Sequence, residues 1–231
     1  MIPDLGVIIA AGGSSRRYGE KDKLTEILGA MPVFLHSIAE FSPLVAPGNL
    51  IVAARCGAIE EYKKLAAHYL PQVSIVWVPG GESRAESVCN ALQALPLTSG
   101  VVAIHDAARP LATAELLTRL VNRARICGGA IAASKVVDSL KKVDGSGKIV
   151  CGVSRDNLYH AETPQVFDLE KYRLAYEKLT DYQMTDDAGI MLDSGVDVEV
   201  VPSEQWNMKL TSPEDLEKLH TVFTGEKNVE K

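Results

Sequence analysis

Short apolar runs rich in β-branched residues alternate, over the first 135 residues, with longer segments in which apolar positions recur every three or four residues. In 84–95, for example, Val88, Ala91, Leu92 and Leu95 fall on one face of a helix. Near-continuous apolar strands separated by helices are typical of a parallel sheet covered on both faces. The predicted strands are 6–11, 50–54, 73–78, 101–105 and 130–134, and the predicted helices are 33–41, 59–69, 84–95 and 114–127.

The pattern changes after Ser134, where residues 136–153 become mainly polar. A turn sequence, Asp-Gly-Ser-Gly at 144–147, lies between two short strand-like runs at 140–143 and 148–150, which predicts a β-hairpin. A hairpin inserted into an α/β domain has little core of its own. We therefore expect this arm to pack against another subunit.

Helical periodicity returns at 169–179 and again from Thr185, a predicted N-cap followed by two aspartates in the first turn. Late strands are predicted at 196–201 and 207–210, and Ser212-Pro213 predicts the start of a last helix. No repeat or linker divides the sequence. We predict one domain over residues 1–231: an α/β, Rossmann-like open sheet, mostly parallel, with helices on both faces and residues 136–153 as a protruding β-hairpin arm.

Composition narrows the class of protein. There are 24 Lys and Arg against 30 Asp and Glu, a net charge of −6 with no basic block, which argues against nucleic acid or anionic membranes as partners. No apolar run approaches the roughly 20 residues that a bilayer requires, and we expect no secretory or transit signal before the first strand. The four cysteines form no CxxC pair, so we expect reduced thiols in a cytoplasmic protein and no zinc site.

The first predicted strand leads into small and basic residues, AAGGSSRR at 10–17, followed by Lys21 and Lys23. Small residues let the backbone approach a ligand, and consecutive N–H groups can bind an anion. Four cations against two carboxylates give residues 16–23 a net charge of +2. The loop is neither a Walker A loop nor a GxGxxG motif. Alone, it indicates a nucleotide or a simple Gly/Ser turn with solvated charges.

Asp106 follows an apolar strand, which puts its carboxylate at the sheet edge where open α/β sheets bind ligands. A carboxylate there can hold Mg²⁺ together with triphosphate oxygens, although a helix or turn cap would also explain it. His105 could be proposed as a general base. A histidine at a strand end is more often structural, so it is left out of the candidate site.

Six segments together carry a family resemblance. AAGGSSRR with a lysine eleven positions after Gly12 is similar to the signature of nucleotidyltransferases that activate sugars and alcohols. With it occur GGESRAESV (80–88), HDAARP (105–110), TPQVF (163–167), TDDA (185–188) and NMKLT (207–211). Over nearly its whole length the sequence resembles the 2-C-methyl-D-erythritol 4-phosphate cytidylyltransferase family. The resemblance implies CTP and a polyol phosphate as substrates, Mg²⁺ as cofactor, and a homodimer formed through the arm.

The resemblance also implies roles for individual residues. Three cations match the groups around the transferred phosphate: Arg16, Lys23 and Lys209. The nucleotide site would comprise Ala10, Ala11, Gly12, Gly13, Gly80, Gly81, Ser87 and Asp106, with Asp106 also holding the metal. The acceptor site would comprise Asp106, Arg109, Ser139, Arg155, Thr163 and Thr185, and the arm would bring residues of two chains together there. A phosphate nucleophile is already anionic, so no general base is needed.

Some positions depart from the family pattern, and alternatives stay open. Arg17 replaces an apolar residue, Asp22 a proline and Ser139 a threonine. Asp22-Lys23 is more typical of molybdopterin guanylyltransferases, but TPQVF and TDDA argue against these. Ribitol-5-phosphate cytidylyltransferase shares the fold and chemistry. A nucleotide-binding module without turnover is the alternative from another class, although such a module has no need of three cations on one phosphate.

Overall fold

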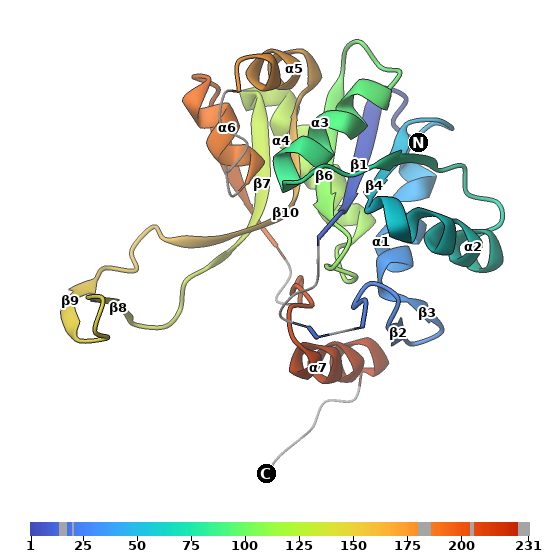
Figure 1. The fold of residues 1–231 in the computed structure, drawn as a ribbon. Coiled ribbons are helices and arrows are strands. Elements are labelled where there is room, and N and C mark those ends of the chain that lie inside the picture. Colours follow the sequence, from blue (N-terminus) through green and yellow to red (C-terminus); the bar gives the residue numbers. More distant parts are fainter. Residues whose placement is uncertain (14–17, 20, 180–185, 204–205, 226–231) are drawn as a thin grey trace.

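The computed structural model describes residues 1–13, 18–19, 21–179, 186–203 and 206–225, and its centre is a seven-stranded sheet (Figure 1). The strand order is β11-β7-β10-β6-β1-β4-β5. β10 (Tyr159–Asp168) runs antiparallel between β6 and β7. The predicted open, mostly parallel α/β sheet is confirmed. The strands that share one direction are β1 (Leu5–Ala11), β4 (Leu50–Ala54), β5 (Val76–Pro79), β6 (Val101–Asp106), β7 (Gly129–Lys135) and β11 (Val198–Pro202).

Helices cover both faces of the sheet, as predicted. Alternate residues of β1 point to opposite sides: Val7 and Ile9 belong to one buried cluster and Ile8 to the other. The first cluster takes in α1 (Val33–Phe41), α2 (Ile59–Tyr69), α4 (Ala114–Cys127) and α7 (Pro213–Thr224). The second takes in α3 (Arg84–Ala94), α5 (Leu169–Glu177) and α6 (Asp187–Asp193). Short pieces complete the described chain: β2 (Ile27–Leu28), β3 (Met31–Pro32) and the 3₁₀ turns Ser42–Leu44 and Cys56–Ala58.

Two predictions about the second half of the chain are wrong. Residues 207–210 form no strand, because their backbone meets the loop after β6 instead of a sheet neighbour: Leu210 N donates to Ala108 O at 2.8 Å. The N-cap of α6 is Asp186, whose carboxylate accepts from Gly189 N at 3.1 Å, and not Thr185, which lies outside the described residues. β10 was not predicted as a strand. Its many polar residues and Pro164 do not give the apolar pattern that predicts a strand.

The predicted hairpin is present as β8 (Leu140–Val143) and β9 (Ile149–Val153), which pair antiparallel and project away from the sheet (Figure 1). Asp144 shapes the turn, since its Oδ1 accepts from Ser146 N at 2.9 Å and from Lys148 N at 3.0 Å. Both strands expose nearly all their residues. Among the helices of the described residues, none is both long and apolar enough for a membrane crossing.

Candidate active site

A cavity of about 520 Å³ lies at the carboxyl ends of the parallel strands. Strand register brings its walls together: Ala10 lies opposite Asp106, Ala11 opposite Ala54, and Ala54 opposite Pro79. The loops that follow β1, β4, β5 and β6 therefore meet at one edge, where open α/β sheets bind ligands. The lining comprises Ala10, Ala11, Gly12, Gly13, Lys23, Leu24, Arg55, Gly81, Glu82, Ser83, Arg84, Ser87, Asp106, Ala108 and Lys209.

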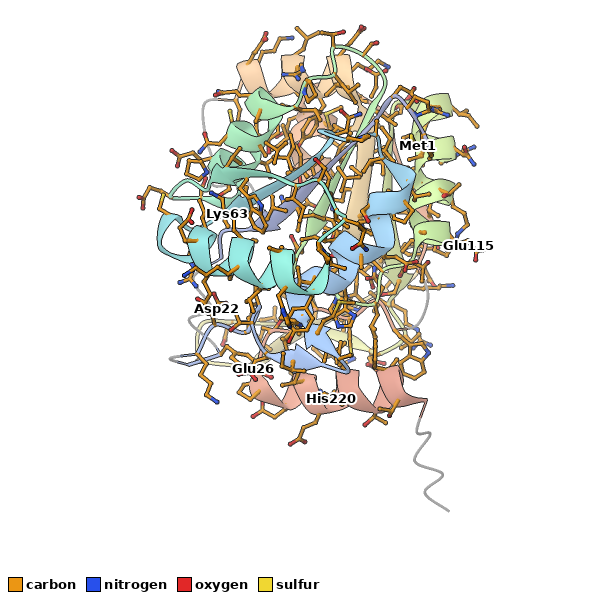
Figure 2. All side chains as sticks on the ribbon, turned by 90° about the vertical axis from the view of Figure 1, so that its right-hand side faces the viewer. Met1, Asp22, Glu26, Lys63, Glu115 and His220 are labelled. Atoms are coloured by element: carbon orange, nitrogen blue, oxygen red, sulfur yellow. The ribbon has the colours of Figure 1, made fainter. Side chains whose placement is uncertain are left out.

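Asp22 fastens the loop after β1 to the neighbouring strand and helix. Asp22 lies beside α2 (Figure 2). Its Oδ2 lies 2.6 Å from Arg55 Nη2 and accepts a 2.6 Å hydrogen bond from the hydroxyl of Tyr62, a residue of α2. Its Oδ1 accepts from Leu24 N at 3.1 Å. Burial raises the pKa of Tyr62, so the phenol stays a donor. The sequence left Asp22 unexplained, and the structure gives it an anchoring role.

Lys23 lies in the cavity wall, and its Nζ donates to the carbonyl of Leu210 at 2.8 Å. This bond ties the first loop to the segment that carries Lys209. Arg16 and Arg17 fall outside the described residues. The structure thus brings two of the three predicted phosphate-binding cations, Lys23 and Lys209, into one cavity.

The glycines and Ser87 form a close-packed corner of the cavity. Ser87 Oγ accepts from Gly81 N at 3.0 Å and donates to Ser83 O at 2.9 Å. A Cβ on Gly12 or on Gly80 would lie 3.0 Å from Ser87 Oγ, tighter than ordinary contact. Two loops can therefore approach the serine only because these positions lack side chains. Gly80 itself is held to β4 by a 2.7 Å bond from its N to Ala54 O.

Asp106 is the charged centre of the cavity. Its Oδ2 lies 2.6 Å from Lys209 Nζ, and its Oδ1 lies 3.2 Å from Arg84 Nε. Burial alone would raise the pKa of Asp106, but the positive charges of Arg84 and Lys209 outweigh it and hold that pKa well below the usual range. The carboxylate is therefore ionised at neutral pH.

Arg84, which could be a surface arginine by sequence alone, is mostly buried. Besides Asp106 it binds Asp187, with Nη1 2.6 Å from Oδ2. Burial works against its charge, but the two carboxylates outweigh it and raise the pKa of Arg84 further. Single-sequence patterns gave no sign of this arrangement, because Asp187 lies 103 positions further along the chain.

Asp106 could hold a metal ion only as a single carboxylate ligand. Within the described residues, no three His, Cys, Asp or Glu side chains come together to hold a metal. Both Asp106 oxygens accept a bond from a cation, yet each carboxylate oxygen has two lone pairs, so acceptor capacity remains. Mg²⁺ commonly takes one or two carboxylates and completes its shell with substrate phosphates and water. Asp106 fits that pattern only in company with a bound polyphosphate.

His105 and Thr163 support Asp106 from behind. Thr163 Oγ1 accepts from Asp106 N at 3.0 Å, so its proton points to His105 Nδ1, 3.1 Å away. His105 Nε2 then carries the hydrogen and donates to Arg109 O at 3.1 Å. Burial lowers the pKa of His105 to about 4. A neutral, fully buried imidazole with both nitrogens bonded is structural, which agrees with leaving it out of the site.

Arg109 is not among the residues that line the cavity. Its Nη1 donates to Asn207 O at 2.6 Å, and Asn207 Nδ2 donates to Glu162 Oε2 and to Thr163 O, both at 2.9 Å. These bonds hold the segment before α7 against β10 and so place Lys209. Sequence reasoning missed Glu162 and used Asn207 only as part of a motif.

Two of the remaining candidates, Ser139 and Arg155, are not among the residues that line the cavity. Both side chains are exposed, at or next to the arm. Arg155 donates a hydrogen bond to the carbonyl oxygen of Val137. Thr185 falls outside the described residues. Within the described residues, one chain therefore brings the nucleotide-site candidates together and places Thr163 against Asp106, whereas Ser139 and Arg155 stay apart from them.

Comparisons with known proteins point to one family. Residues 5–224 match the family model IspD, 2-C-methyl-D-erythritol 4-phosphate cytidylyltransferase. The chain is similar to proteins of that name from Syntrophus aciditrophicus (34% identity, 94% of each chain covered) and Halalkalibacterium halodurans (36% identity, 92% of this chain and 94% of the relative). It is also similar to the crystal structure of 4-diphosphocytidyl-2C-methyl-D-erythritol synthase from Anaerococcus prevotii, with 27% identity, a TM-score of 0.81, and 95% and 98% of the two chains covered. The chain therefore belongs to the 2-C-methyl-D-erythritol 4-phosphate cytidylyltransferase (IspD) family.

Proposed function

We propose that this enzyme transfers CMP from CTP to 2-C-methyl-D-erythritol 4-phosphate, in the non-mevalonate route to isoprenoid precursors. The products are 4-diphosphocytidyl-2-C-methyl-D-erythritol and pyrophosphate. The observation that carries the proposal is one cavity at the strand ends, lined by Lys23, Arg84 and Lys209, in which Arg84 and Lys209 both pair with an ionised Asp106. A site with several cations suits a reaction whose main barrier is the negative charge that builds up on the phosphate groups in the transition state.

The reaction is an in-line displacement at phosphorus. A phosphate oxygen of the acceptor forms a bond to the α-phosphorus of CTP, and the bond from that phosphorus to the oxygen bridging to the β-phosphate breaks, so pyrophosphate leaves with the electron pair. The nucleophile is already anionic near neutral pH, so no base has to remove a proton. Arg16, Lys23 and Lys209 stabilise the charge of the transition state.

The base of CTP fits the corner built by small residues. Ala10, Ala11, Gly12 and Gly13 provide backbone groups on one side, and Gly80, Gly81 and Ser87 provide them on the other. The loops of Gly12 and Gly80 pack close to Ser87 Oγ, and we propose that this narrow corner selects the smaller pyrimidine ring. This supports CTP over GTP.

Asp106 is the residue that would hold Mg²⁺ together with triphosphate oxygens. When bound, the metal supplies positive charge against the phosphate groups. The protein's own part is to keep the carboxylate ionised and oriented, through Arg84 and Lys209 on its oxygens and Thr163 on its main-chain N–H.

The acceptor site is shared between two chains of a homodimer in this proposal. Arg109, Thr163 and Thr185 come from the body, whereas Ser139 and Arg155 come from the exposed arm of the second chain. The arm carries four half-exposed apolar side chains, which a dimer interface would cover: Val143, Ile149, Val150 and Val153. We place the enzyme in the cytoplasm, since its four cysteines are free thiols.

Pyrophosphate release tests the function directly. The protein is incubated with CTP and Mg²⁺ and either 2-C-methyl-D-erythritol 4-phosphate or ribitol 5-phosphate, with GTP replacing CTP in a third arm. We expect release only with CTP and the first acceptor, and none from the Asp106→Asn variant. Pyrophosphate release with ribitol 5-phosphate would show that the proposed acceptor is wrong. Release with GTP would show that the proposed nucleotide is wrong. No release with any pair would favour a nucleotide-binding module.

A further inference from the structure

Behind the cavity wall, Asp187 is a buried carboxylate that no step of the proposed reaction uses. Its side chain is 0% exposed, at the first position of α6. Oδ1 accepts from the Tyr172 hydroxyl at 2.6 Å and from the Tyr176 hydroxyl at 2.9 Å, and Oδ2 meets Arg84 Nη1 at 2.6 Å. A buried charge is tolerated only where such partners compensate for lost water.

The two tyrosines act as fixed donors. Burial raises the pKa of both Tyr172 and Tyr176, so their hydroxyl groups stay protonated. Tyr172 is fully buried and stacks on Phe167 with ring centroids 5.2 Å apart. Asp187 is therefore held by rigid neighbours from α5 and has little freedom to follow Arg84.

Arg84 connects this buried carboxylate to the cavity. One edge of its guanidinium faces Asp187, and Nε faces Asp106. Because the guanidinium is planar and rigid, fixing one edge fixes the direction of the other. Asp106 in turn meets Lys209. Two carboxylates and two cations thus alternate from the interior to the cavity, with no net charge.

We infer that Asp187 is a positioning residue for nucleotidyl transfer: by holding Arg84 it sets the orientation of Asp106 and Lys209 toward the reacting phosphate. This inference rests on the proposed function. Without the charge of Asp187, Arg84 is free to turn fully to Asp106 and draw its carboxylate away from Lys209. The reacting groups would then be misplaced although each is still present.

Asp187→Asn tests the inference, because the amide keeps the size of the side chain and removes its charge. We expect kcat to fall about 10- to 100-fold, the usual effect of losing an orienting partner. KM for CTP should change less than about threefold, since Lys23 and Ser87 do not touch Asp187. Asp186→Asn is the matched control: asparagine is an equally good N-cap, so its kcat should match wild type.

A double-mutant cycle separates positioning from plain structural support. If Asp187 acts through Arg84, adding Asp187→Asn to Arg84→Met should change kcat less than about twofold, whereas independent losses would multiply. The double variant should also melt at a higher temperature than Arg84→Met alone, which leaves a buried carboxylate without its cation. If Asp187→Asn alone does not fold, the comparison of Arg84→Met with the double variant still decides.

Three results would overturn the inference: wild-type kcat in Asp187→Asn, multiplied losses in the double variant, or an equal kcat loss in Asp186→Asn. Wild-type activity in the same assay is the reference. If wild type releases no pyrophosphate from CTP and the acceptor, the proposed function fails. If wild type is active and the cycle is additive, only the role of Asp187 fails.

Discussion

The ammonium group of Lys23 lies 2.8 Å from the carbonyl oxygen of Leu210, 187 positions away in the sequence. This contact joins the loop after β1 to the segment that holds Lys209. Two lysines that lie far apart in the sequence therefore line one cavity. Each depends on the other's segment for its place.

Lys23→Ala should lower kcat by about two to three orders of magnitude, the usual loss for one group that stabilises transition-state charge. The fold should persist, since one hydrogen bond to a backbone carbonyl contributes only about 1 kcal/mol. Steady-state kinetics and circular dichroism check both points. Lys21→Ala is the control: Lys21 is exposed and outside the cavity lining, so its loss should change kcat less than about threefold. Unchanged turnover in Lys23→Ala would remove that lysine from the mechanism.

Asp22→Ala should loosen the loop after β1. The variant leaves the buried Tyr62 hydroxyl without its acceptor, which costs about 1–3 kcal/mol of unfolding free energy. We expect KM for CTP to rise about tenfold, because the loop that carries Lys23 loses its link to β4 and α2. Glu60→Ala removes an exposed carboxylate from α2 and should change neither quantity. An unchanged KM in Asp22→Ala would show that the loop keeps its shape without this anchor.

The fold was largely predictable because its signals are local. Each apolar strand and amphipathic helix of the first half follows from spacing within about ten residues. The errors arise where partners are distant. β10 is a strand because β6 and β7 flank it, and 207–210 is not one because its backbone neighbour is Ala108. No local pattern contains either fact.

The candidate site divides in the same way. Glycine and lysine positions after β1, and Asp106 after β6, could be named from small residues, charge and strand ends. The role of each residue could not be predicted, because it depends on contacts that form only on folding. These contacts are Asp22 with Arg55, Arg84 with Asp187, and Thr163 with His105. Those contacts join residues 33, 103 and 58 positions apart. A single sequence carries no record of which distant pairs touch.

The neutral state of His105 predicts a pH dependence of stability. Its pKa is lowered to about 4 in the folded chain against an ordinary value of 6.5, so the unfolded chain binds more protons between these values and stability falls as pH falls. From pH 7.5 to pH 5 the contribution of His105 to this loss is about 2 kcal/mol. Urea unfolding at both pH values measures it.

Two variants isolate the contribution of His105. His105→Asn keeps an acceptor near Thr163 but cannot titrate, so the difference between the two pH values should shrink by about 2 kcal/mol. His220→Asn, on α7 (Figure 2), should leave that difference as in wild type. If His105→Asn keeps the full difference, other groups cause the acid sensitivity.

The arm predicts a link between assembly and acceptor binding. Ile149 and Val150 are each 61% exposed on β9, and apolar side chains gathered on a projecting hairpin favour a covered interface. Ile149→Asp/Val150→Asp should therefore convert the proposed dimer to monomers in light scattering. If Arg155 of a second chain completes the acceptor site, as proposed, KM for the polyol phosphate should rise at least tenfold, whereas KM for CTP should stay within about twofold. Lys148→Ala, at the turn of the same hairpin, should leave both unchanged. A monomeric variant with wild-type KM for the acceptor would show that one chain builds the acceptor site by itself, and a dimeric one would show that the arm does not form the interface.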